Sequence, residues 1–561
     1  MDVLRRWAPG LATLRRYERG WLRFDLVAGV VLAAILVPQG MAYAELAGLP
    51  PVTGLYTTIA CLVAYAIFGP SKVLVLGPDS SVSPLILASI TPLIVAGDPG
   101  SALALAGMLA ILVGVIEIGL GIARLGFVAD LLSSEVRVGY LNGLAVTIIV
   151  GQLPKLFGFS TDADGFVDEL RAFFDGIGAR NTTTLVTGLA VLAVLLVLPR
   201  FTRKVPAVLV AVVGVTVASA AFDLASHGVA TVGTLPHGFP TPRLPWTNWS
   251  DLGALAVGAV GITMVSLTDT IATASSFAAR HGDEVDADAE MVGVGASNVA
   301  SGLFQGFAVS VSGSRTAVAD QSGAKTQATG VVGAALVALL LLVANGLLAD
   351  LPQAALAAVV IAAALSLMDL PALARFARLR RSSLVISLVA SAGVIFLGVL
   401  QGIVVAIVLA ILLFFRRNWW PHGAQLGHVP GTGGWHSLAV YPDAEQVPGI
   451  VVFRWEAPLF FANAAQFRDQ VRALVREHEP SFVVLQCEAV TDIDVTAAEV
   501  LEDLDEELNA AGVHLAFAEL RDRLRDLVRR YGLHSTLDEA HFYGSVEDAV
   551  ADLRDEVGGG G

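Results

Sequence analysis

The chain has 561 residues, of which 55% are hydrophobic and 15% are charged, and its mean hydropathy is +0.70. Soluble globular proteins carry about a quarter charged residues, so this composition excludes that class and indicates a protein with several membrane spans. The formal net charge of −15 is confined to the C-terminal part, because residues 1–442 hold 25 acidic and 25 basic residues whereas residues 443–561 hold 25 and 10. The acidity therefore belongs to a separate C-terminal domain and disfavours nucleic acid as a partner.

Fourteen apolar segments can be counted in chain order. They lie at 25–47, 52–69, 72–95, 103–122, 126–154, 182–199, 205–222, 252–278, 287–308, 312–324, 327–349, 353–369, 383–400 and 402–415. The segments 287–308 and 312–324 are weak or short, so hydropathy alone allows eleven to fourteen spans.

Charge gives an independent test of the count. With fourteen spans and a cytoplasmic N-terminus, the basic clusters at 200–204, 375–381 and 416–417 face inside, and the acidic loops 156–181 and 223–251 face outside. This positive-inside pattern favours fourteen spans with both termini cytoplasmic. Arginine outnumbers lysine 31 to 4, which suggests a GC-rich bacterial genome and hence the bacterial inner membrane. No cleavable signal peptide is evident.

The two halves of the membrane part share a faint repeat. A polar break near Gln39 is followed by the sequence GPDSS at 77–81, and a polar break at Asp269 is followed by SGSRT at 312–316. Seven spans per half is an odd number, so the two halves must be inverted relative to each other. Folds of this kind bind their substrate at the membrane midplane, between short half-helices. Coincidence between two glycine-rich loops is the alternative.

The stretch PQGMAYAELAGLPPVTGLY at 38–56 places proline, glycines and polar residues at membrane depth. Unpaired polar groups in hydrocarbon cost several kcal/mol each, so a plain anchor helix has no use for them. The stretch therefore predicts an interrupted span that lines a solute site, with Glu45 as an intramembrane acid.

The segment from Val309, VSVSGSRTAVADQSGAKTQ, predicts an anion site. It reads as extended at first and becomes helix-compatible from Arg315, with Ser312, Gly313 and Ser314 as good N-cap residues. Free backbone N–H groups, the positive end of the helix dipole and a guanidinium would meet there. The alternative for Arg315 is an internal salt bridge, to Asp79, Asp269 or Asp320.

The facing half is LVLGPDSSVSPLI, in which Gly77-Pro78 breaks the chain and Asp79, Ser80 and Ser81 could cap a half-helix. Asp79 itself repels an oxyanion unless it is protonated or paired, so we interpret it as the partner of Arg315 or as a proton or sodium site. Asp269 lies among hydroxyls that include Thr273, and an intramembrane acid there is a candidate coupling-ion residue.

These motifs resemble those of the sulfate permease (SulP) family, which includes the prestin-like anion exchangers. The stretch 38–56 is similar to the family's first-helix signature, the sequence GLYTTIACLVAYAIFGPSKVLVLGPDSSVS resembles the next two helices, and SGSRTAVADQSGAKTQ resembles the turn that opens the tenth. The resemblance implies seven plus seven inverted spans, as in uracil permeases, with a core domain (spans 1–4 and 8–11) and a gate domain (spans 5–7 and 12–14).

By the same resemblance, the anion lies between the half-helices of spans 3 and 10. The substrate-binding residues that we predict are Gln39, Tyr43, Ser80, Ser81, Ser314, Arg315 and Thr316, and the predicted coupling-ion residues are Asp269, Thr273, Asp79 and Glu45. Many family members lack a carboxylate at the position of Asp79, which favours proton-coupled uptake over simple anion exchange.

After residue 443 the pattern alternates between strands and amphipathic helices, as expected for a small α/β domain. It resembles the STAS domain that the family carries at this place. In related anti-sigma antagonists an Asp-Ser pair holds a phosphorylated serine; here Asp494 is followed by Val495 and Thr496, so the serine is missing and only Thr496 could substitute. We expect the domain to mediate dimerisation or protein contacts.

The expected organisation is an N-terminal segment (1–24), a transport domain (25–418), a linker (419–442), the STAS domain (443–556) and a glycine tail (557–561). The expected function is secondary active transport of sulfate or bicarbonate, coupled to protons or sodium, by an elevator-like motion. A dicarboxylate or chloride transporter is the alternative; a nucleobase permease or an anion channel is less favoured, and an enzyme least.

Two further expectations follow from composition. Neither a metal site nor a disulfide is indicated, because Cys61 and Cys487 lie in different environments and the histidines of the C-terminal part have no metal-ligand spacing. No cofactor is expected other than a coupling H⁺ or Na⁺.

Overall fold

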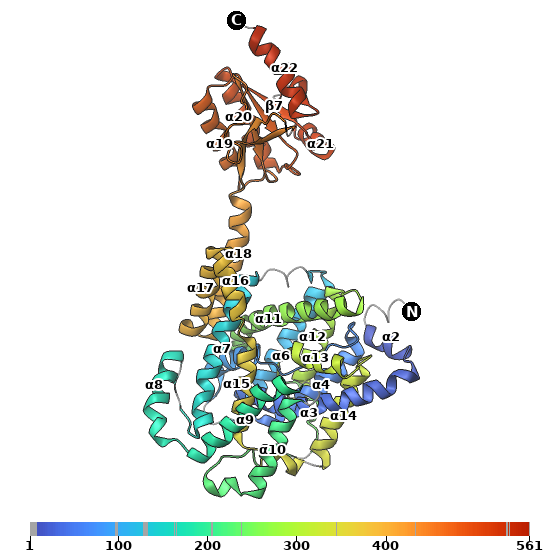
Figure 1. Ribbon diagram of the computed structural model, residues 1–561. Helices are drawn as coiled ribbons and strands as arrows, with labels where there is room; N and C mark the ends of the chain where they lie inside the picture. The colour runs from blue at the N-terminus through green and yellow to red at the C-terminus, as the bar shows by residue number, and fades with distance from the viewer. Residues whose placement is uncertain are drawn as a thin grey trace. The chain divides into compact units, whose positions relative to one another are not determined.

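The computed structural model describes residues 8–95, 99–126, 133–161, 163, 165–202, 206–236, 238–343, 345–431, 433–533, 537 and 539–559. The chain divides into two compact units, Met1–Ala410 and Ile411–Gly561. The boundary falls inside helix α18 (Val399–Trp419), upstream of residue 418, the predicted end of the membrane part. Figure 1 shows the chain coloured from its N-terminus to its C-terminus.

Helices dominate the first unit. Its elements are α2 (Pro9–Arg15), η1 (Arg19–Trp21), α3 (Leu22–Leu46), α4 (Pro51–Phe68), β1 (Leu76–Gly77), α5 (Ser83–Ile90), η2 (Thr91–Leu93), α6 (Pro99–Ile122), α7 (Ser134–Phe157), α8 (Phe166–Gly176), η4 (Ile177–Ala179), α9 (Thr182–Phe201), α10 (Ala207–Ala221), η5 (Leu224–His227), α11 (Trp249–His281), α12 (Ala287–Leu303), β2 (Ser310–Val311), α13 (Gly313–Gln321), α14 (Ala328–Val343), η6 (Asn345–Leu348), α15 (Gln353–Leu367), α16 (Leu370–Leu379), α17 (Arg381–Leu397) and the first half of α18.

Each of the fourteen predicted spans contains one of these helices; the spans 126–154 and 205–222 begin at or near residues outside the described part. Within that part, seven helical stretches are long and apolar enough to cross a membrane, and five shorter helices are also apolar. The remaining two, α12 and α13, correspond to the segments in which hydropathy is weakest. They carry polar side chains because they face protein, as described below.

Two spans are interrupted near their middle, where their extended segments pair. Strand β1 runs antiparallel to β2, with Leu76 opposite Val311 and Gly77 opposite Ser310. Short helices follow each strand, α5 from Ser83 and α13 from Gly313. The antiparallel direction is the one expected when two equivalent segments come from inverted halves.

The helix contacts of the first half recur in the second half. If each helix is replaced by the helix seven spans later or earlier in the chain, a contacting pair in one half becomes a contacting pair in the other. The contact of α3 with α14 corresponds to that of α11 with α6, the contact of α6 with α12 to that of α14 with α4, and the contact of α7 with α17 to that of α15 with α9. The first unit is therefore a helical membrane domain built from two inverted repeats of seven spans.

Contacts also separate the helices into two sets. The large set consists of α3, α4, α5, α6, α11, α12, α13 and α14, and the small set consists of α7, α9, α10, α15 and α17. Contacts are dense within each set, and the main ones between the sets run from α3 to α10 and α15.

The first span differs from the prediction. Helix α3 continues without a break from Leu22 to Leu46 with Pro38 inside it, so this span is not interrupted. The glycines of the motif allow close packing, because a Cβ on Gly54 of α4 would clash with the carbonyl oxygen of Gly40. Any larger residue at Gly54 would push α3 and α4 apart.

The second unit is an α/β domain. It contains β3 (Gly423–His428), β4 (Trp435–Ser437), β5 (Ile450–Trp455), α19 (Ala464–His478), β6 (Phe482–Gln486), α20 (Val495–Ala510), β7 (His514–Ala518), α21 (Asp522–Arg530), η8 (Glu539–His541), β8 (Phe542–Tyr543) and α22 (Val546–Gly559). The strand order is β4-β3-β5-β6-β7-β8, parallel from β5 to β8, with β3 antiparallel to both of its neighbours. Apolar clusters lie on both faces of the sheet.

The folded elements of this unit extend past two of its predicted boundaries. Strands β3 and β4 belong to the sheet, so much of the predicted linker 419–442 is part of the folded domain. Glycines suggested a linker, but Gly423 is required by close approach, since a Cβ there would lie 2.5 Å from the ring of Phe453. Helix α22 continues through Gly559, so the predicted tail is partly helical, and residues 560–561 lie outside the described part.

Candidate functional site

A cavity of about 530 Å³ opens where the two interrupted spans meet α3 and α11. Its polar lining is contributed by Gln39, Tyr43, Asp79, Ser80, Asp269, Thr273, Ser312 and Ser314, and all of these residues lie on elements of the large set or their connections. The opposite wall comes from α7, α9, α10 and α15 of the small set and is apolar except for Ser366. The hydroxyl of Ser366 is already bonded to the carbonyl of Ala363, 2.6 Å away. Apart from Ser366, the polar side chains of the described cavity wall all belong to the large set.

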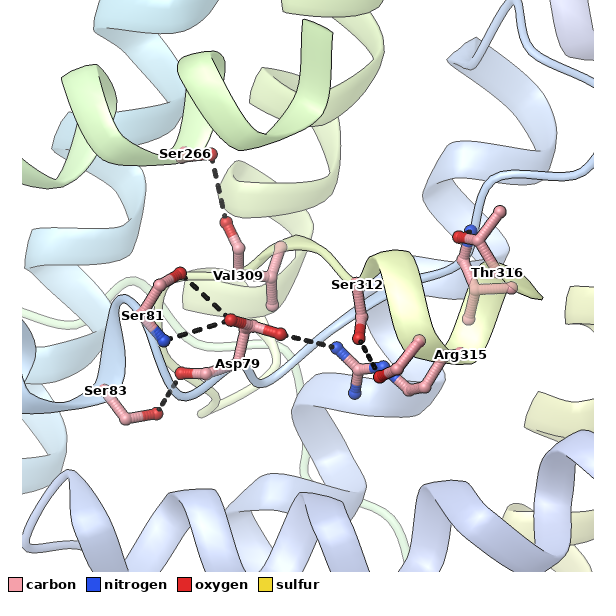
Figure 2. A network of polar contacts seen from close by, with 10 residues as sticks. Asp79, Ser81, Ser83, Ser266, Val309, Ser312, Arg315 and Thr316 are labelled. Atoms are coloured by element: carbon pink, nitrogen blue, oxygen red, sulfur yellow. Dashed lines mark hydrogen bonds and ion pairs between the residues drawn. The ribbon is translucent and has the colours of Figure 1, made fainter. Parts of the chain in front are cut away.

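Asp79 is held in a fixed orientation between the two half-helices (Figure 2). Its Oδ1 accepts hydrogen bonds from the backbone N–H of Ser81 at 3.0 Å and from the Ser81 hydroxyl at 2.9 Å. The hydroxyl of Ser83, the first residue of α5, donates to the Asp79 carbonyl at 2.8 Å. The Gly77-Pro78 break thus leads into a turn whose free backbone groups are partly satisfied by its own side chains.

Arg315 lies behind the cavity wall. Its side chain has no solvent exposure, and Nη2 is 3.7 Å from Oδ2 of Asp79. None of its three nitrogens makes a hydrogen bond within the described part of the chain. It packs against β1, where a Cβ on Gly77 would be 2.8 Å from Nη1, so any larger residue there would require the guanidinium to move. The ion pair with Asp79, one of the predicted alternatives for Arg315, is present.

The N-terminus of α13 faces the cavity. Ser312, the N-cap, has extended backbone angles, and its N–H donates to the carbonyl of Val75 at 3.0 Å. Gly313 and Ser314 follow in the first turn, where helical N–H groups have no acceptor in their own helix. Two hydroxyls, those of Ser312 and Ser314, lie 3.2 Å apart beside them. N–H groups, hydroxyls and the positive helix end together suit an anion.

Asp269 and Thr273 bring a second carboxylate and a further hydroxyl to the same cavity from α11. Asp269 also borders a smaller cavity together with Arg137 and Tyr140 of α7. The site therefore combines two carboxylates, Asp79 and Asp269, with one buried guanidinium.

The structure places seven of the eleven predicted site residues on the cavity wall: Gln39, Tyr43, Asp79, Ser80, Asp269, Thr273 and Ser314. Ser81, Arg315 and Thr316 lie behind it, and the Thr316 hydroxyl accepts a hydrogen bond from the Val75 N–H at 3.0 Å. Glu45 does not reach the cavity, because its carboxylate faces Lys155 of α7 at 3.8 Å.

Sequence reasoning missed two buried polar residues that bind the segments on either side of β2 and α13. Asp25, fully buried, accepts hydrogen bonds from the turn between α13 and α14, including both the N–H and the hydroxyl of Thr326. Asn298 of α12 hydrogen-bonds to both the N–H and the carbonyl of Val309, the residue directly before β2. The signal in the sequence that points to Asn298 is a polar residue within an apolar segment of weak hydropathy. Among the described residues, no cluster of His, Cys, Asp and Glu could hold a metal ion.

Comparison with known proteins agrees with this architecture. The model of the Sulfate permease family matches residues 22–390, and that of the STAS domain matches residues 441–549. A protein of Mycobacterium tuberculosis named probable sulfate transporter is 42% identical over 551 residues, covering 98% of each chain. Human solute carrier family 26 member 6 is 32% identical, covering 83% of this chain and 64% of its own length.

Solved structures share the fold. The murine solute carrier 26 family member A9, an anion transporter in the inward-facing state, superimposes with a TM-score of 0.89 at 24% identity, covering 98% of this chain and 94% of its own. The transmembrane domain of the cyanobacterial bicarbonate transporter BicA gives a TM-score of 0.62 at 24% identity, covering 70% of this chain and 98% of its own.

Proposed function

Because the chain belongs to the sulfate permease family of anion transporters, we propose that it is a secondary active transporter of an inorganic oxyanion, sulfate or bicarbonate. Sulfate is named for the mycobacterial relative and bicarbonate for the cyanobacterial transporter. The observation that carries the proposal is the start of α13, which opens into the cavity beside the Asp79–Arg315 pair.

In this proposal the oxyanion occupies the cavity in front of Ser314. Its oxygens accept hydrogen bonds from the first N–H groups of α13 and from the hydroxyls of Ser312, Ser314 and Ser80, with Gln39 and Tyr43 of α3 closing the site from the side. Arg315 acts through its field from behind β1 rather than by direct contact. A charge held in a low-dielectric wall is screened far less than one in water.

Coupling follows from the charges in the site. Asp79 and Asp269 together outweigh the single guanidinium, so an anion that enters would meet an excess of negative charge. A proton or a sodium ion bound at Asp269, with Thr273 as a neighbouring oxygen ligand, would remove that excess. The cation would therefore favour anion binding, which is the requirement for symport.

The two sets of helices support an elevator-like motion. We assign the large set as the core that carries the anion and the small set as the gate. Apart from Ser366, the polar side chains of the described cavity wall belong to the core, and the rest of the gate's wall is apolar. Such a wall can slide past the site without breaking hydrogen bonds, so the core could move against it as a rigid body.

The remaining elements of the proposal concern location and assembly. The chain is a multi-pass membrane protein, and the distribution of basic residues supports a bacterial inner-membrane location with cytoplasmic termini. We also propose a homodimer and protein contacts through the STAS domain, and no catalytic activity. Crosslinking in membranes would test the dimer.

The test is uptake of radiolabelled sulfate and bicarbonate into proteoliposomes under proton and sodium gradients imposed separately. We expect uptake of one anion to follow one gradient. Uptake of succinate or chloride in place of both oxyanions would establish the alternative substrate class. Uptake of sulfate or bicarbonate that follows neither gradient would contradict the proposed coupling to a cation and would indicate an anion exchanger.

A further inference from the structure

A second buried polar group stands behind the site, between α6 and α12. Glu117 of α6 and Asn298 of α12 both have no solvent exposure, and the Asn298 amide donates to Oε2 of Glu117 at 2.8 Å. The other carboxyl oxygen of Glu117 has no hydrogen-bond partner in the described part of the chain. The cavity wall contains neither residue, so the site described above does not account for them.

Asn298 connects this pair to the site. Its Oδ1 accepts the Val309 N–H at 2.7 Å and its Nδ2 donates to the Val309 carbonyl at 3.3 Å, so one side chain holds both backbone polar groups of one residue. Figure 2 shows Ser266 of α11 reaching the same carbonyl, at 3.5 Å. Val309 directly precedes β2, which leads through Ser312 into α13.

We propose that Asn298 is a positioning residue of the anion site, and that Glu117 orients it as a neutral carboxylic acid. The inference rests on the proposed function for the identity of the site. Without Asn298, the Val309 peptide would lose partners inside the protein, and β2 could shift along β1. Such a shift would displace the first N–H groups of α13 from the anion.

The neutral form of Glu117 follows from its surroundings. A carboxylate buried without a cation costs several kcal/mol, whereas a neutral acid needs only hydrogen bonds. No ion pair to Glu117 is present among the described residues, and its bonded neighbour is an uncharged amide donor. A glutamine at this position would keep an acceptor for Asn298, so Glu117→Gln should reproduce the positioning role.

The experiment compares variants of the full chain in proteoliposomes. Asn298→Ala and Glu117→Ala should raise the KM for the anion about tenfold, the cost of roughly one hydrogen bond, with the maximal rate per folded protein little changed. The effects should not add in the double variant, because both residues act through one contact. Ser297→Ala is the matched control, since this buried hydroxyl of α12 bonds only to its own helix, at Gly293. Merely structural damage would lower the amount of folded protein and leave KM unchanged.

Three further variants guard against failure to fold. Asn298→Asp places two acids side by side and removes the amide that donates to the Val309 carbonyl, so it should raise KM. The exchange Glu117→Gln with Asn298→Asp restores a donor and an acceptor between the two side chains but not the donor to Val309, so it should recover only part of the loss. Glu117→Gln alone should keep KM within about twofold of the unmodified chain. A Glu117→Gln variant that fails as badly as Glu117→Ala would overturn the neutral positioning role.

A thiol-labelling readout separates this inference from the proposed substrate. Ser314→Cys places a thiol on the exposed first turn of α13, while the native Cys61 and Cys487 are buried. In that background Asn298→Ala should change the rate of labelling by a methanethiosulfonate reagent several-fold, and Ser297→Ala should not. Unchanged labelling would refute the positioning role whether or not the protein takes up sulfate. Changed labelling, together with no uptake of either oxyanion by the chain that retains Ser314, would contradict the proposed substrate and leave the positioning role in place.

Discussion

The carboxylate of Asp79 lies 3.7 Å from the guanidinium of Arg315, and the pair joins the two interrupted spans beside the antiparallel strands β1 and β2. The arginine side chain is fully shielded, whereas that of Asp79 retains 12% exposure and lines the cavity. An anion in the cavity therefore meets the field of the pair, with the carboxylate in front and the guanidinium behind.

This arrangement predicts different results for single and double charge removal. Arg315→Ala should abolish anion uptake and lower stability by about 3 kcal/mol, because it leaves the Asp79 carboxylate without a cation. Asp79→Asn combined with Arg315→Ala should recover most of the stability without recovering uptake. Thermal melting in detergent and uptake into proteoliposomes measure the two effects. Uptake preserved in Arg315→Ala would remove this arginine from the site.

Cation coupling should depend on Asp269 and not on Glu45. Asp269→Asn should remove the dependence of uptake on the driving cation gradient while uncoupled anion movement persists, because the carboxylate that binds the cation is gone. Glu45→Gln is the matched control, since Glu45 faces Lys155 outside the cavity. The measurement is anion uptake with and without each gradient. Loss of coupling in the Glu45 variant, or its retention in the Asp269 variant, would move the cation site elsewhere.

Asp25 should prove important for stability without contributing to anion affinity. Its buried carboxylate accepts hydrogen bonds from Tyr17, Lys325, Thr326 and Thr329, which ties the start of α3 to the turn between α13 and α14. Asp25→Asn replaces one accepting carboxylate oxygen with an NH₂ group that faces N–H and O–H donors. It should lower the free energy of unfolding by about 1–3 kcal/mol. The midpoint of thermal unfolding should fall while the KM of the remaining protein stays constant. Asp175→Asn, on the exposed helix α8, is the control.

The C-terminal domain should lose stability in alkaline solution through Cys487. Burial, and secondarily the charge of Glu519, raise the pKa of the Cys487 thiol to about 12, against about 8.5 in an unfolded chain. The folded state holds this proton more tightly, so its contribution is complete below pH ~8.5 and is lost as the pH rises toward 12. Denaturation followed by Trp455 fluorescence should show a smaller loss between pH ~8 and ~10 in Cys487→Ala than in the unmodified chain. An equal loss of stability with pH in the two proteins would contradict the raised pKa of Cys487.

Much of the membrane fold could be predicted from the sequence, because apolar length and charge balance act locally. The span that contains α12 is weak in hydropathy for a reason that the structure supplies. Glu290 of α12 bonds to Tyr65 at 2.6 Å, and Asn298 bonds to Glu117, so the polar residues of this helix are paired inside the protein. The hydropathy of this segment is a weak signal for a span, and the positions of the basic clusters supplied the evidence for fourteen spans.

Contacts between distant residues account for what could not be predicted. Asp25 follows an arginine-rich stretch and resembles an ordinary surface charge, yet its partner Thr326 is 301 residues away. The sequence predicts Arg315 at the anion site, but it does not specify that the guanidinium packs against Gly77 of β1. Seven of the predicted site residues still line one cavity, because the helix breaks that bring them together are visible in the sequence.

The missed strand β3 gives the last prediction. Gly427 pairs with His436 of β4, and a Cβ at this glycine would lie 2.8 Å from the Cβ of Ala444, a contact that real structures do not tolerate. Gly427→Val should therefore separate β3 from its neighbours and destabilise the C-terminal domain by about 2 kcal/mol. Gly544→Ala is the control, because the nearest atom to a Cβ there is 3.8 Å away. Urea denaturation followed by Trp455 fluorescence would detect the difference, and equal midpoints for the two variants would show that 423–428 behaves as a linker after all.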